Sequence, residues 1–203
     1  MKARQRSPAR VLASTLLLAF LPISAFAHAE GEAAGAGFVT GFLHPLSGVD
    51  HVLAMLAVGM WGAQLGAPAI WMLPVAFPMV MALGGAAGII GVPLPSVEIG
   101  ITLSVLVLGS MIALDRRPPL WGAALIVAFF AVFHGYAHGA ELPGQTGAVA
   151  YSAGFVAATG MIHLTGIGIG FVVKVPHGSE ILRIGGSAIA LTGLLLAGQL
   201  LLG

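Results

Sequence analysis

The stretch HPLSGVDH (His44–His51) places two imidazoles and a carboxylate inside an otherwise apolar segment, 36–64. On a regular helix, residues seven positions apart share a face, so His44 and His51 would lie about 10 Å apart. Pro45 interrupts helical hydrogen bonding, and a break there would let these groups approach more closely. Ionisable side chains at membrane depth are costly and usually mark an ion path or a reaction site. The stretch therefore predicts an interrupted first helix that carries functional groups.

The composition predicts an integral membrane protein. The chain has 203 residues, of which 58% are hydrophobic and only 7% charged, whereas a soluble domain carries about 25% charged residues. There are 30 glycines and no cysteines. Glycine suits close packing between membrane helices, and the lack of cysteine excludes disulfides and thiolate metal sites.

The remainder of the chain divides into apolar segments close to the ~20 residues that a spanning helix needs. Short breaks rich in proline and glycine separate these segments. The sequence predicts an all-α integral membrane protein, a single bundle of six transmembrane helices over 28–203. The predicted spans are 36–64, 69–91, 97–114, 119–140, 146–173 and 181–202.

Residues 1–27 have the pattern of a cleaved secretory signal peptide. A basic start is followed by an apolar run and by Ala25-Phe26-Ala27, which matches a small-x-small cleavage site. An uncleaved first transmembrane helix is the alternative. Cleavage would make His28 the new N-terminus, where its α-amine and imidazole can chelate a divalent metal. An ordinary polar leader is the other interpretation of this segment.

The charges predict the orientation in the cytoplasmic (inner) membrane. Cleavage and six spans would place the mature N- and C-termini in the periplasm and the loops after helices one, three and five in the cytoplasm. The basic residues beyond the leader fall in or beside those loops, as the positive-inside rule expects; they are Arg116, Arg117, Lys174 and Arg183.

With this orientation, acidic residues and histidines gather at the outer side without balancing basic residues. An acidic mouth of this kind concentrates cations. The outer carboxylates are Glu30, Glu32, Asp50, Glu98 and Glu141, and the outer histidines are His28, His44, His51, His134 and His138.

A second motif, HGYAHGAE, ends the fourth predicted span. His134, His138 and Glu141 lie at positions i, i+4 and i+7, so their side chains form one stripe on a helix. A histidine pair at this spacing can bind one transition metal, and the carboxylate can be a ligand or orient an imidazole. Polar groups that reach towards the interface from a helix end are the structural alternative. We expect a metal site that combines this stripe with Asp50 and the histidines of the first motif.

His163 lies about 17 residues into the fifth predicted span, in the inner half of the membrane. A buried, hydrogen-bonded histidine is one interpretation. With the outer cluster, His163 would instead be a second station for a metal moving inward.

The combination of HPLSGVDH in the first span, HGYAHGAE in the fourth and a histidine in the fifth resembles the HupE/UreJ family of membrane proteins. The resemblance covers about residues 28–203 and implies a secondary permease that supplies hydrogenase or urease with nickel, with cobalt as the other candidate ion. By position, the metal-linked residues it implies are His44, Asp50, His51, His134, His138 and Glu141.

The resulting hypothesis is a transporter and not an enzyme, with no bound cofactor. Ni²⁺ would be its cargo, Co²⁺ the other candidate, and membrane lipid its surroundings; no nucleic-acid partner is expected, and the oligomeric state stays open. The chain has no GxxxxGK[ST] phosphate-binding loop, so coupling to ATP within the chain is not expected.

Three other classes remain open from the residues alone. An intramembrane zinc-dependent hydrolase would use His134, His138 and a third histidine as ligands, with Asp50 or Glu141 activating water. A haem protein with paired axial histidines would leave the neighbouring carboxylates unexplained. A structural module would have to bear the cost of burying many ionisable groups without using them.

Overall fold

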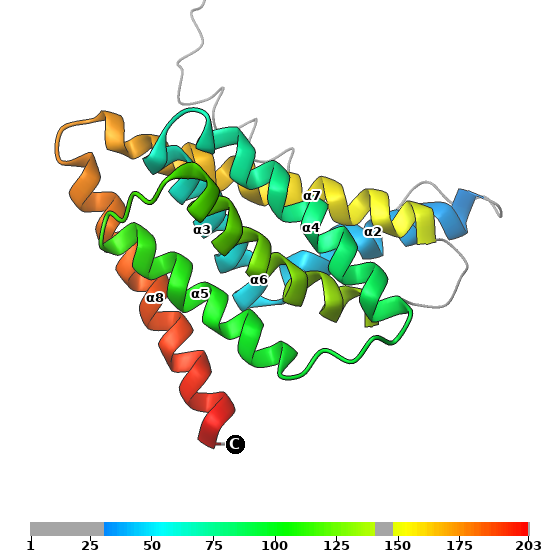
Figure 1. The fold of residues 1–203 in the computed structure, drawn as a ribbon. Helices are drawn as coiled ribbons and strands as arrows, with labels where there is room; N and C mark the ends of the chain where they lie inside the picture. The colour runs from blue at the N-terminus through cyan, green and yellow to red at the C-terminus, as the bar shows by residue number, and fades with distance from the viewer. Residues whose placement is uncertain (1–30, 141–147, 203) are drawn as a thin grey trace, which may run out of the picture.

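Long apolar runs that end at proline and glycine determine the helices of this protein. The computed structural model describes residues 31–140 and 148–202, and every regular element within these ranges is helical, which confirms the all-α fold. The α-helices are α2 (Gly31–Ser47), α3 (Val49–Leu65), α4 (Ala69–Ile89), α5 (Val97–Ala113), α6 (Leu120–Ala140), α7 (Ala148–Gly170) and α8 (Gly178–Leu202), with a 3₁₀ helix, η2 (Phe171–Lys174), between the last two (Figure 1). The signal peptide predicted over 1–27 lies outside the described residues, and so do His28 and Glu141.

The first predicted span is two helices and not one. α2, from Ala36, and α3 meet at an angle of 82°, and Gly48 between them has an extended backbone with φ −100° and ψ 118°. Pro45 lies inside α2, in its last turn, so the break falls three residues after the proline. Proline removes a helical hydrogen bond and weakens this turn, and the chain changes direction at the next glycine.

Several helices fit a multi-pass membrane protein. Within the described residues, four helices are long and apolar enough to cross a membrane, and the bent pair α2–α3 would make a fifth. α5 is apolar but has 17 residues, which is at the lower end of the ~17–25 residues that cross a bilayer.

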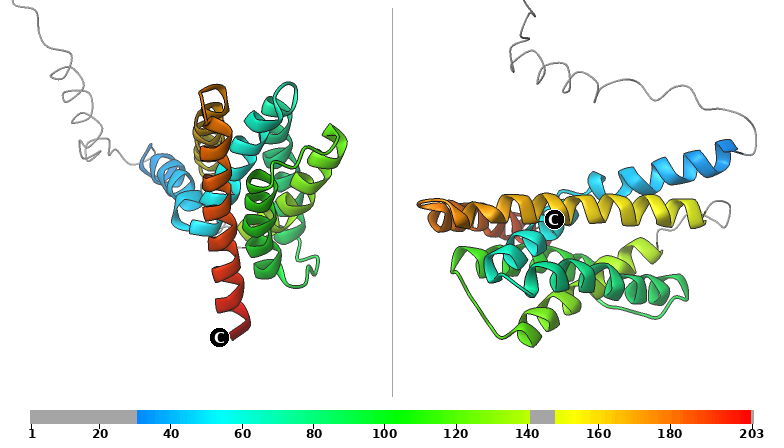
Figure 2. Two further views of the ribbon diagram at one scale, coloured as in Figure 1. Left: turned by 90° about the vertical axis from the view of Figure 1, so that its left-hand side faces the viewer. Right: turned by 90° about the horizontal axis from the view of Figure 1, so that it is seen from above.

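α3 is the central helix. It is buried from Ala54 to Gln64, except for the half-buried Leu56. The fully buried Trp61 and Met55 belong to the main hydrophobic core. α3 packs against α4, α5 and α7, while α4 packs on α6, α5 on α8 and α2 on α7. Figures 1 and 2 show α2 beside α7 at one side of the bundle, and α8 beside α5 at another.

The helices approach closely at glycines, and these contacts give their relative directions. In the pairs α3–α7 and α4–α6, later residues of one helix contact later residues of the other, so the two helices of each pair are parallel. In the pair α5–α8, later residues of one helix contact earlier residues of the other, so these two helices are antiparallel. Six successive membrane crossings would produce this pattern. The contacts are Gly59–His163 and Ala63–Gly170 for α3–α7, Gly84–Val132 and Gly88–Tyr136 for α4–α6, and Gly109–Ala190 and Gly193–Leu106 for α5–α8.

Candidate metal site

The bend at Gly48 positions the residues of the first motif. His44 is in the last turn of α2, whereas Asp50 and His51 are in the first turn of α3. A side chain at Gly48 would crowd the next turn, because its Cβ would lie 2.8 Å from Asp50 Oδ1 and 2.9 Å from His51 Nδ1. Glycine therefore suits this position because it has no Cβ to crowd these side chains and because its backbone bends easily.

Asp50 and His51 form a tightly bonded pair. Asp50 Oδ1 accepts the backbone N–H of His51 and the Nδ1–H of the His51 ring, each at 2.8 Å. An ionised carboxylate only accepts hydrogen bonds, so Nδ1 carries the ring proton and Nε2 keeps a lone pair. His51 Nε2 is buried and has no hydrogen-bond partner among the described residues.

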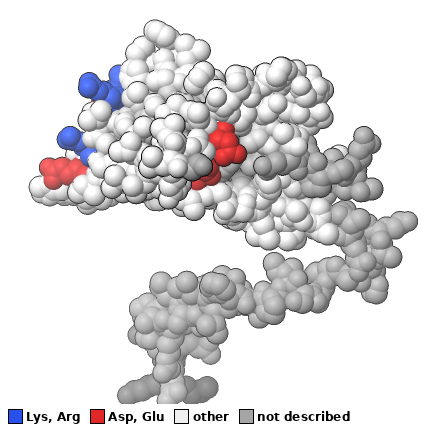
Figure 3. All heavy atoms as spheres, turned by 90° about the horizontal axis from the view of Figure 1, so that it is seen from below, with Lys and Arg blue, Asp and Glu red and all other residues white. Residues whose placement is uncertain are grey.

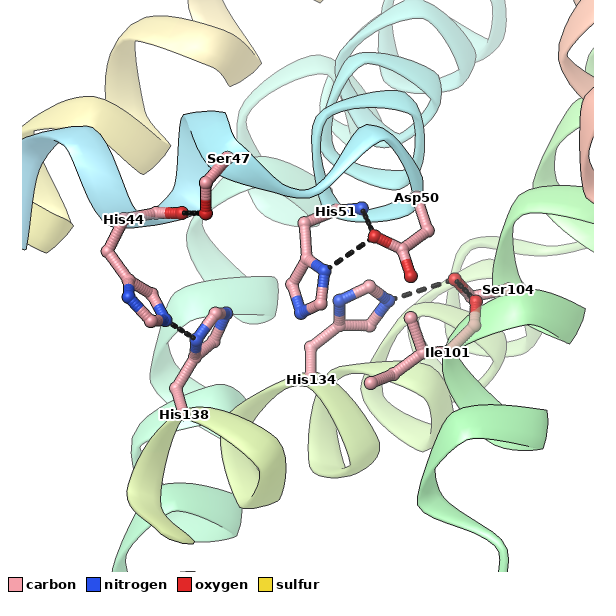
Figure 4. A network of polar contacts seen from close by, with 8 residues as sticks. All are labelled: His44, Ser47, Asp50, His51, Ile101, Ser104, His134 and His138. Carbon is pink, nitrogen blue, oxygen red and sulfur yellow. Dashed lines mark hydrogen bonds and ion pairs between the residues drawn. The ribbon is translucent and has the colours of Figure 1, made fainter. Parts of the chain in front are cut away.

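α6 brings His134 and His138 to the same place, one turn apart on one face. The ring centroid of His51 lies 4.7 Å from that of His134 and 4.6 Å from that of His138. The ring centroids of His44 and His138 are 4.8 Å apart. The structure therefore joins His44, His51, His134 and His138, from α2, α3 and α6, in one group, which we call the four-histidine cluster (Figure 4).

Three ring nitrogens of the cluster are buried without a hydrogen-bond partner in the described part of the chain: His51 Nε2, His134 Nδ1 and His138 Nε2. Buried polar atoms are normally paired, and unpaired ones call for an explanation. Neutral imidazole nitrogens are common ligands for borderline divalent metals. Across 31–140 and 148–202, no three His, Asp or Glu side chains are already arranged around one point as a metal-binding group, so the rings would have to turn to share an ion.

A cavity of about 230 Å³ opens beside the cluster. Its lining includes Asp50, His51, His44 and His138, together with Glu98 from the first turn of α5. Glu98 is exposed, so an entering cation would meet two carboxylates next to the imidazoles.

Sequence reasoning missed Ser104 on α5. This buried serine lies 2.9 Å from His134 Nε2 through its Oγ and 2.6 Å from the carbonyl oxygen of Ile101 (Figure 4). Ser104 belongs to an apolar run with no neighbouring polar motif, so nothing in the sequence distinguishes it.

His163 is not part of the cluster. Its backbone packs against Gly59, which is eight residues along α3 from His51, or about 12 Å at the helical rise. The ring is 2% exposed, and its Nε2 has no partner in the described ranges. The structure places His163 at a separate level of the bundle, beside the middle of α3.

Phe77 on α4 lies between these two levels. Its ring centroid is 5.4 Å from that of His134 and 5.4 Å from that of His163, and its side chain is completely buried. Nothing in the sequence distinguishes Phe77 from the other apolar residues of its span.

The described basic residues gather at one end of the bundle. The described Lys and Arg residues lie after α5, in η2 and in α8. Figure 3 shows them together at one end, with one group of acidic side chains beside them and another well away from them. Two hydrogen bonds connect other helices to the end of α5 and the residues after it. Arg183 Nε of α8 donates to the Ala113 carbonyl, and Trp61 Nε1 of α3 donates to the Arg116 carbonyl.

Comparison with known proteins identifies similar sequences. The family model described as HupE / UreJ protein matches residues 16–196. Protein HupE of Rhizobium leguminosarum bv. viciae is 44% identical over 179 residues, which is 88% of this chain and 94% of that protein. No solved structure matches significantly. The chain belongs to the HupE/UreJ family.

Proposed function

We propose that this protein is a secondary permease that carries Ni²⁺, with Co²⁺ as the other candidate, from the periplasm to the cytoplasm. The observation that carries this proposal is the group of three buried ring nitrogens, without hydrogen-bond partners among the described residues, beside an acidic cavity. The family is associated with nickel and cobalt uptake for hydrogenase and urease, which supports this choice of cargo.

The cavity beside the cluster would collect the ion. Asp50 and Glu98 line it, and carboxylates at a mouth raise the local concentration of cations. The hydrated ion would then exchange water for the imidazoles of His51, His134 and His138, while His44 contacts His138 at the cavity wall. His28 and Glu141, outside the described residues, remain proposed as contributors at this outer side.

Movement inward would proceed past Phe77 to His163. The buried Phe77 ring contacts both His134 and His163, so it separates two groups of nitrogen ligands. An ion that leaves the cluster would need this ring to move aside before it reaches His163 Nε2. Conduction requires sites that bind an ion and also release it, and two stations with a mobile ring between them meet this requirement.

The membrane arrangement that we propose has six spans, with the cluster near the periplasmic side. The parallel and antiparallel contacts between helices fit six successive crossings, and the described basic residues all lie towards one end. The positive-inside rule makes that end cytoplasmic. In this arrangement the protein lies in the inner membrane with both mature termini in the periplasm.

Nickel uptake by cells tests the proposal. Cells that express the wild type should accumulate ⁶³Ni²⁺, whereas His51→Ala and His138→Ala should fall to the empty-vector level at matched membrane abundance. His177→Ala is the matched control, because this histidine is exposed on the loop before α8, beside Glu180. Uptake by the wild type at the vector level, with stoichiometric zinc in the purified protein, would replace the permease with the zinc hydrolase.

A further inference from the structure

The contacts of Ser104 determine which nitrogen of His134 carries a proton. A serine hydroxyl has one hydrogen to donate, and a carbonyl oxygen only accepts. At 2.6 Å from the Ile101 carbonyl oxygen, Ser104 Oγ must donate its hydrogen to that oxygen. Its contact with His134 Nε2, at 2.9 Å, is then one in which Ser104 Oγ accepts. The proton of neutral His134 is therefore on Nε2.

The other nitrogen of His134 consequently has a free lone pair. His134 is completely buried, and its Nδ1 has no hydrogen-bond partner among the residues that the structure describes. Figure 4 shows this nitrogen on the side of the ring that faces His51, while Nε2 faces Ser104. A metal ligand must present such a lone pair.

His51 is held in the opposite tautomer. Asp50 accepts from its Nδ1–H, which leaves the lone pair on Nε2, and the two ring centroids are 4.7 Å apart. The Asp50 carboxylate thus fixes the His51 ring, and the Ser104 hydroxyl fixes the His134 ring. Each ring keeps one nitrogen without a hydrogen-bond partner among the described residues.

We propose that Ser104 is a positioning residue of the four-histidine cluster, which holds His134 with Nε2 protonated and Nδ1 available to bind the transported ion. The inference rests on the proposed function for the identity of the ion, but the assignment of the tautomer does not depend on it. Groups that orient a histidine ligand in this way commonly change metal affinity by about 10- to 100-fold when removed.

Ser110 provides a matched control in the same helix. Its hydroxyl also donates to a backbone carbonyl, that of Leu106 at 2.7 Å. Ser110→Ala and Ser104→Ala therefore each remove one hydroxyl-to-carbonyl bond from α5, but only Ser104→Ala removes the partner of His134 Nε2.

The tautomer is measured first, by ¹⁵N NMR of purified, metal-free protein labelled at histidine. Protonated and bare ring nitrogens have well-separated chemical shifts, and a His134→Gln spectrum identifies the signals of His134. We expect protonated Nε2 and bare Nδ1 in the wild type and in Ser110→Ala, and a mixture of tautomers in Ser104→Ala. Protonated Nδ1 in the wild type would overturn the inference.

Binding of Ni²⁺ by the same proteins, measured by calorimetry, is the second readout. We expect Ser104→Ala to bind about 10-fold or more weakly, Ser110→Ala to match the wild type, and Ser104→Thr to recover affinity because it retains the hydroxyl. An unchanged His134 tautomer and affinity in folded Ser104→Ala would show that Ser104 does not position the ring, while nickel binding by the wild type would still stand.

A wild type that binds no nickel would contradict the proposed function instead. The NMR measurement would then still decide the relation between Ser104 and His134. The two failures are therefore distinguishable.

Discussion

His44 Nε2 and His138 Nδ1 lie 2.9 Å apart and join α2 to α6 through a single hydrogen bond between two imidazoles. One ring donates and the other accepts. When His138 is the donor, its buried Nε2 has a lone pair, as His51 Nε2 and His134 Nδ1 do. In this state the lone pair on His138 Nε2 is available to the ion at the metal site proposed above.

The first prediction concerns this bond. His44→Ala should weaken Ni²⁺ binding by about 10-fold or more, because His138 loses the group that orients it. His44→Gln should lose less Ni²⁺ affinity, since the glutamine amide oxygen can still accept a hydrogen bond from His138. Calorimetric titration of purified protein measures both. Equal affinities for His44→Ala and wild type would show that the bond has no role in binding.

The second prediction concerns the bend. Gly48→Ala should reduce nickel uptake strongly while the protein still folds, because the added Cβ displaces the Asp50 and His51 side chains and no backbone of another helix. Gly160→Ala is the matched control, since nothing lies within 4 Å of a Cβ at that position. Uptake and thermal unfolding are measured side by side for both variants. Normal uptake by Gly48→Ala would mean that the Asp50–His51 pair tolerates displacement.

The third prediction separates binding from movement. His163→Ala should leave Ni²⁺ affinity at the cluster near the wild-type value but reduce transport, because His163 packs beside α3 about two helical turns beyond His51. Equilibrium binding and initial rates of uptake are compared in the same preparations. A loss of affinity equal to that of His51→Ala would place His163 in the same site as the cluster.

The fourth prediction concerns the contact between α4 and α6. A Cβ at Gly135 would collide with the backbone of Met81, so Gly135→Ala must move the helix that carries His134 and His138. Overpacking of this kind costs about 1–3 kcal/mol. The melting temperature in detergent should fall for Gly135→Ala but not for Gly168→Ala, where the space for a Cβ is open. Equal melting temperatures would show that α6 adjusts without cost.

The helix positions were predictable because apolar runs and their proline and glycine breaks are local signals. The predicted segment 119–140, for example, corresponds to α6 at Leu120–Ala140. The break in the first segment was expected at Pro45 but lies at Gly48. Proline weakens the turn that contains it, while the place where the chain bends depends on how α2 packs against α7.

The candidate site was predictable only in part. Two motifs with regular spacing pointed to His44, His51, His134 and His138, which the fold brings together. Ser104 and Phe77 contact the His134 ring from α5 and α4, and a single serine or phenylalanine in an apolar helix carries no sequence signal. Their contribution depends on which helices become neighbours, and one sequence does not specify this.

Flux of ⁶³Ni²⁺ into liposomes that contain only the purified protein would show whether this protein alone is a nickel permease, because no other transporter or energy source is present. A nickel gradient should drive uptake by the wild type and by His177→Ala, and His51→Ala should match protein-free liposomes. Uptake by His51→Ala at the wild-type rate would contradict the assignment of the four-histidine cluster to the transport path. No uptake by the wild type would contradict a permease that works alone.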